Sequence, residues 1–174
     1  TGIWLTYRAV WSLALSLASL LPPVLPDSGG DSCTVAVRCG ASSLLVPLVA
    51  ELAALLTGHD VRLTGSSDVP LLALSPRTDL EIPLESEQSL VQYLSTRPES
   101  SSPQVERPRP RDIVVTLDEC QLSSQRLMQD AQSEVHFDLH PPVLTLPSPL
   151  TTHAGHTALW SALLCGLRVV PPPS

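Results

Sequence analysis

The sequence contains no lysine and no asparagine, so arginine supplies all ten basic side chains among the 174 residues. Seventeen acidic residues outnumber them and give a formal net charge of -7. Nucleic-acid-binding domains present clustered basic side chains, often interleaved with aromatic ones. No stretch of this kind occurs, so we expect no nucleic-acid partner.

Aromatic residues are scarce, at 3% of a chain that is 43% hydrophobic. The core must therefore be built from Leu, Val and Ala, and the length suits a single domain. No Cys-x-x-Cys pair occurs, and the spacing of Cys33 and Cys39 is too wide for a zinc knuckle. Two disulfides and buried free thiols remain alternative states of the four cysteines, which are Cys33, Cys39, Cys120 and Cys165.

Residues 1–26 form the most apolar part of the chain, and Pro22 and Pro23 end the helix that we predict there. Two stripes recur at helical spacing. One is aromatic (Trp4, Tyr7 and Trp11) and the other consists of small residues (Ser12, Ser16 and Ser19). We interpret both stripes as interaction surfaces.

Three roles are open for this helix. A membrane anchor would need about 20 apolar residues, with aromatic and basic residues such as Arg8 at one end. A buried packing helix and a signal peptide are the alternatives. The first predicts a membrane-associated protein, with the secretory pathway as one location, and the second a soluble intracellular one.

The rest of the chain alternates between strand and helix patterns. Residues 27–32 form a predicted linker, 33–170 a domain with an extended loop at 97–111, and 171–174 a tail. Predicted strands cover 34–38, 60–63, 70–74, 112–117 and 134–140, and predicted helices cover 44–56, 85–94, 122–132 and 156–167. Serine caps at Ser43 and Ser123 and a stop at Gly58 bound two of the helices. The pattern predicts an α/β fold with a small, mostly parallel sheet and helices on its faces; α+β is the alternative.

Two polar groups follow predicted strands and are candidates for ligand binding. Gly40, Ser42 and Ser43 precede a helix, whose first amides attract phosphate groups. Asp118 and Glu119 follow the most apolar strand, at the edge of a sheet where ligands gather. These residues predict a nucleotide or phosphosugar site. The alternatives are an ordinary serine-capped turn and an acidic cap of the next helix.

Alternating polar residues from 134 to 140 predict a second type of site. Glu134, His136, Asp138 and His140 would share one face of a strand and could bind a divalent metal ion. Alternatively, these polar side chains are simply exposed to solvent on one face of the strand.

No catalytic residues can be assigned, because no phosphate-binding glycine fingerprint and no defensible nucleophile triad occurs. The cofactor is unknown. We therefore expect a non-catalytic accessory subunit of a larger complex, with a protein partner and with membrane association as one option. The alternative is an α/β enzyme, or half of one, that binds a nucleotide or phosphosugar after the first strand.

Overall fold

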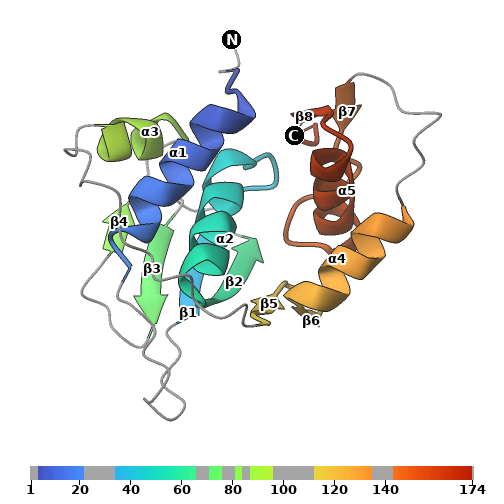
Figure 1. Ribbon diagram of the computed structural model, residues 1–174, viewed down its shortest axis with the longest axis horizontal. Coiled ribbons are helices and arrows are strands. Elements are labelled where there is room, and N and C mark those ends of the chain that lie inside the picture. Colours follow the sequence, from blue (N-terminus) through green and yellow to red (C-terminus); the bar gives the residue numbers. More distant parts are fainter. Residues whose placement is uncertain are drawn as a thin grey trace.

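The computed structural model describes residues 4–21, 34–65, 71–75, 81–83, 87–95, 112–134 and 143–173 (Figure 1). The helices are α1 (Tyr7–Ala18), α2 (Leu45–Thr57), α3 (Glu87–Ser95), α4 (Ser124–Ser133) and α5 (His153–Leu164). The strands are β1 (Thr34–Cys39), β2 (Asp60–Gly65), β3 (Leu71–Ser75), β4 (Glu81–Pro83), β5 (Val114–Thr116), β6 (Gln121–Ser123), β7 (Val143–Thr145) and β8 (Arg168–Val170). The predicted linker at 27–32 and the predicted loop at 97–111 lie outside the described residues.

Six strands form one sheet in the order β4-β3-β1-β2-β5-β6. Its central strands β1, β2 and β5 are parallel, and antiparallel strands flank them on both sides. Strands β7 and β8 form a separate parallel pair. Helix α1 comes first, and β1-α2-β2 is the predicted βαβ unit. The predicted α/β class is therefore confirmed.

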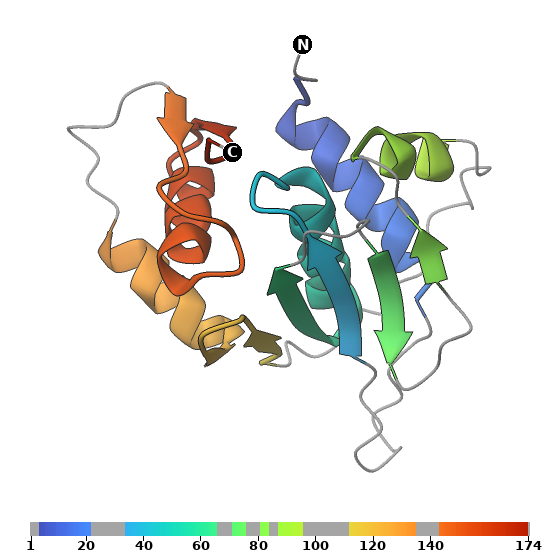
Figure 2. The same cartoon turned by 180° about the vertical axis from the view of Figure 1, so that it is seen from behind.

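One face of the sheet carries the core. Val35 and Val37 of β1 and Val61 and Leu63 of β2 are buried, and the residues between them are less buried because side chains alternate along a strand. Helix α2 packs on β1 and β2, while α1 packs on α2. Figure 2 shows the sheet in front of these two helices, which lie side by side behind it.

Helix α2 is buried on more than one side because it touches the sheet, α1 and the C-terminal elements. A helix that is apolar around its whole circumference is typical of this position. Gly58 ends the helix in a left-handed conformation (φ 78°), as predicted. The prediction of a serine cap at its start is wrong: Leu44 is the N-cap residue and has no side-chain bond to the helix. The amide of Ser43 donates instead to the Gly40 carbonyl.

Helix α1 is shorter than the apolar run that predicts it. It has 12 residues, and the hydroxyl of Thr6 accepts a hydrogen bond from the Ala9 amide at its start. Leu13 and Leu17 are buried in the main core, where each contributes about 1.5–3 kcal/mol. Within the described residues, no helix combines the length and apolar character that a membrane span requires. Helix α1 packs on α2 and contributes to the main core.

Candidate functional site

The aromatic stripe of α1 lies at the surface. Trp4 is 70% exposed, Tyr7 49% and Trp11 46%. Tyr7 and Trp11 lie on one side of the helix because they are four positions apart, and Leu13 and Leu17 on the other side hold α1 in the core. The prediction that Trp4 continues this helical stripe is wrong, because the helix begins only at Tyr7, after the extended residue Thr6. We call Trp4, Tyr7 and Trp11 the aromatic face.

Tyr7 connects the aromatic face to the end of α5. Its hydroxyl donates a hydrogen bond to the carbonyl of Leu167. Partial burial, together with the nearby Cys165 thiol, raises the pKa of the Tyr7 phenol. Leu164, at the end of α5, is also an exposed hydrophobic residue. The hydrogen bond therefore brings Tyr7 next to the chain that follows α5.

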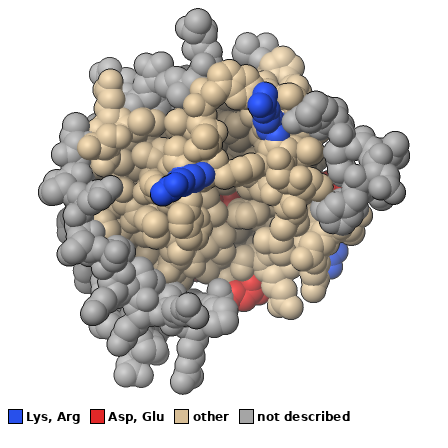
Figure 3. All heavy atoms as spheres, turned by 45° about the horizontal axis from the view of Figure 1, so that its top comes forward, with Lys and Arg blue, Asp and Glu red and all other residues tan. Residues whose placement is uncertain are grey.

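Few charges lie on the side of the molecule that carries the start of α1. Figure 3, in which the top of Figure 1 comes forward, shows mostly uncharged atoms on the visible face, with basic side chains and some acidic atoms among them. The top of Figure 1 carries the start of α1, together with β7 and β8. Arg8 of α1 and Arg168 of β8 are both exposed. Each of these arginines directly follows one of the two residues, Tyr7 and Leu167, that the hydrogen bond joins.

The serine stripe makes its hydrogen bonds within α1. The hydroxyls of Ser12, Ser16 and Ser19 donate to the carbonyls of Arg8, Ser12 and Ser16 over 3.0, 3.0 and 2.7 Å. Such bonds satisfy the hydroxyl groups without a partner helix. A role of these serines in interaction stays a prediction.

The candidate ligand residues meet at one edge of the sheet. Gly40 follows Cys39, which pairs with Gly65, and both carboxylate oxygens of Asp118 accept from the Gly65 amide over 3.0 and 3.2 Å. The Asp118 amide donates to the Thr151 carbonyl over 3.1 Å. Asp118 thus joins β2, the end of β5 and the loop before α5. The alternative role of Asp118 as a cap of the following helix is wrong, because Ser123 caps α4 with a 3.1 Å bond from the Arg126 amide, as predicted for Ser123.

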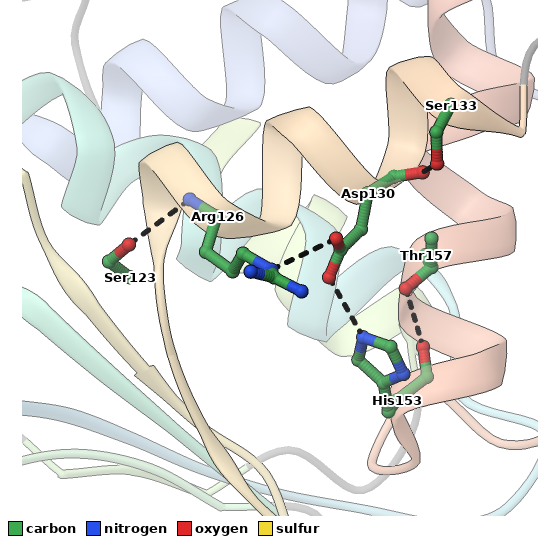
Figure 4. Close-up of polar contacts among 6 residues, drawn as sticks. All are labelled: Ser123, Arg126, Asp130, Ser133, His153 and Thr157. Carbon is green, nitrogen blue, oxygen red and sulfur yellow. Dashed lines mark hydrogen bonds and ion pairs between the residues drawn. The ribbon is translucent and has the colours of Figure 1, made fainter.

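An open groove of about 520 Å³ lies between α4 and α5. The sequence did not predict this groove. It is lined by Glu119, Cys120, Leu122, Arg126, Asp130 and His153. Asp130 accepts from Arg126 over 3.0 Å and lies 3.3 Å from Nε2 of His153 (Figure 4). These charges pair with one another and are partly exposed, so each pair contributes little to stability. In the sequence, the four-residue spacing of Arg126 and Asp130 indicates that the two side chains can pair on one face of a helix.

A second polar cluster is fully buried between α2 and α5. Nε2 of His156 lies 2.9 and 3.1 Å from the two carboxylate oxygens of Glu51, and the indole of Trp160 donates to Glu51 over 3.0 Å. Nδ1 of His156 lies 3.1 Å from the Leu150 carbonyl. Glu51 and His156 are 1% and 0% exposed. The cluster therefore has no opening through which a substrate could reach it.

The charge state of His156 follows from these neighbours. Burial on its own lowers the pKa of the imidazole, but the negative charge of Glu51 and the hydrogen bonds to Glu51 and Leu150 outweigh burial and raise it. Both ring nitrogens face oxygen atoms, an arrangement that suits a doubly protonated ring. The pair is a buried ionic link between two helices that are far apart in the sequence.

The predicted metal site is described only at its first residue. Glu134 follows α4 as its C-cap, and the other three residues of the set, His136, Asp138 and His140, lie outside the described residues. Among the residues that are described, no three His, Cys, Asp or Glu side chains come together in a way that could hold a metal ion. The three cysteines in the described ranges form no disulfide, and Cys33 lies beyond those ranges.

Neither a protein-family model nor a curated protein matches this sequence.

Proposed function

We propose that this protein is a non-catalytic accessory subunit that docks onto a larger assembly through the aromatic face of α1. One observation supports the proposal above all others: three of the six aromatic residues of the chain are exposed within eight positions at the start of α1. A chain this poor in aromatic residues would be expected to use them in its core, where their large surfaces stabilise most.

The aromatic face has the composition of a binding surface. Trp, Tyr and Arg are the residue types that most often dominate binding energy at protein interfaces, and Arg8 lies beside Tyr7 in the sequence. The helix that carries them is fixed by buried leucines and by the bond from Tyr7 to Leu167. Little backbone ordering is then needed on docking, which favours affinity.

A comparison of sedimentation tests this proposal. A tagged chain in extract from its natural source is expected to sediment well ahead of an 18.6 kDa monomer. The double variant Trp4→Ser, Trp11→Ser is expected to sediment as a monomer, because the main apolar anchors are removed from an exposed surface. The matched control is Val114→Ser, which removes an exposed hydrophobic residue from β5.

Far-UV circular dichroism of the purified variants must first show native helix content. A wild-type chain that sediments as a monomer, or a double variant that sediments with the wild type, would contradict docking through this face.

A further inference from the structure

Charge is distributed unevenly over the chain. Residues 4–21 and 143–173 contain Arg8 and Arg168 but no aspartate or glutamate. Since the two arginines contribute +2 to a net charge of -7, the remainder of the chain carries -9. The two acid-free segments are the ones that Tyr7 and Leu167 join. The two described segments that this hydrogen bond between Tyr7 and Leu167 joins therefore carry a formal charge of +2, with histidine counted as neutral.

We infer that the aromatic face binds the interface of an anionic lipid bilayer, with Arg8 and Arg168 toward the headgroups. The inference rests on the proposed function and names the surface to which the subunit docks. Trp and Tyr are enriched at membrane interfaces because each has an apolar body and a polar edge. Arginines at the same depth are attracted by anionic headgroups.

The acidic remainder of the chain restricts the orientation in which the protein can bind an anionic membrane. A chain of net charge -7 is repelled by an anionic membrane in most orientations, and the two acid-free segments are the described part of the chain that such a membrane repels least. Leu164 and Val143 of the C-terminal elements are also exposed, and Val143 lies opposite Arg168 in the β7–β8 pair. A bilayer can cover these side chains without a matched shape on the other side, whereas a protein partner needs complementary packing.

Binding of this kind is expected to be reversible. A helix that lies in the interface gains affinity from its buried apolar area and from its charges together. Each arginine near an anionic surface contributes about fivefold to the partition coefficient. Removal of both arginines is therefore expected to weaken binding by about 30-fold, with a smaller loss at high salt.

Vesicle co-sedimentation of the purified full chain tests the inference. Vesicles of 70% phosphatidylcholine and 30% phosphatidylserine are expected to bind the wild type, with a blue shift of tryptophan emission, and pure phosphatidylcholine vesicles at least tenfold more weakly. The variant Arg8→Ser, Arg168→Ser is expected to lose about 30-fold in binding to the anionic vesicles. The control is Arg62→Ser, which removes an exposed arginine from β2 and should leave binding unchanged.

The results separate this inference from the proposed function. Loss of the large assembly in the Trp4→Ser, Trp11→Ser variant, without any binding of the wild type to anionic vesicles, would overturn the lipid inference and favour a protein partner. Equal losses in the Arg62→Ser control and the double arginine variant would also overturn it. A wild-type chain that neither assembles nor binds vesicles would overturn both proposals.

Discussion

Glu51 is the charged residue whose burial has the largest expected consequence for stability. Removal of one partner of a buried ion pair leaves the other charge without compensation, at a cost of about 3–5 kcal/mol. We expect Glu51→Ala to lower the free energy of unfolding by this amount, measured by urea denaturation at pH 7. Glu51→Gln keeps an acceptor for Trp160 and should cost less. A loss below 1 kcal/mol in Glu51→Ala would show that the cluster is unimportant for stability.

The same pair makes stability dependent on pH. The pKa of His156 in the folded state is raised above its ordinary value of 6.5. Between pH 6.5 and the raised pKa, the folded state holds a proton that the unfolded state releases, so the free energy of unfolding falls as the pH rises. The slope cannot exceed about 1.4 kcal/mol per pH unit for one group.

Denaturation of the wild type and of Glu51→Gln from pH 6 to pH 9 measures this effect. The difference in stability between them is expected to shrink as the pH rises, because the variant has lost the carboxylate that holds the proton. Val114→Ser, which removes an exposed hydrophobic residue and no titratable group, is the control and should keep the wild-type slope. A pH-independent difference would contradict a raised pKa.

At the scale of single elements, a capping residue in the sequence predicts a helix boundary correctly only where the capping interaction is formed in the structure. Gly58 and Ser123 end and begin their helices as predicted, because a left-handed glycine and a serine cap are determined by the few residues around them. Ser43 has the same local signal, but its amide is used in the turn with Gly40. Strands β7 and β8 have three residues each and pair across more than 20 residues, so no local period indicates them.

The start of α5 leaves no room for a side chain at Gly155. A Cβ there would collide with the carbonyl oxygens of Ser148 and Pro149, which belong to the backbone and cannot rotate away. We expect Gly155→Ala to destabilise the protein by about 1–3 kcal/mol or more, because the loop before α5 must shift. Thermal unfolding followed by circular dichroism measures the loss.

Gly40→Ala is the matched control, because a Cβ at Gly40 meets nothing within 4 Å. This substitution should be neutral or stabilise by about 0.4–1 kcal/mol, since alanine lowers the entropy of the unfolded chain. Equal losses in the two variants would contradict the crowding at Gly155.

At the scale of the whole molecule, the α/β class could be predicted from the sequence, but the groove and the buried cluster could not. Tyr7 and Trp11 follow one helical period, whereas Trp4 precedes the helix. The buried pair joins Glu51 to His156, which are 105 positions apart, and no periodicity links such residues. On sequence alone Glu51 is the one charge in an apolar helix. Only the position of α2 between the sheet and α5 explains its burial.

The contacts of α2 also predict how the molecule unfolds. Trp160 of α5 lies in the main core, and Leu48 of α2 packs with Leu146, Leu150 and Leu159 in a second cluster. Because both clusters include α2, the C-terminal elements should not unfold before the sheet. The variant Trp4→Phe, Trp11→Phe leaves Trp160 as the only tryptophan. We expect its fluorescence and the far-UV circular dichroism to change in one coincident urea transition, the mark of two-state unfolding. A fluorescence transition at lower urea than the loss of helix would instead show that α5 detaches first, and that the Glu51–His156 link is weaker than the core around the sheet.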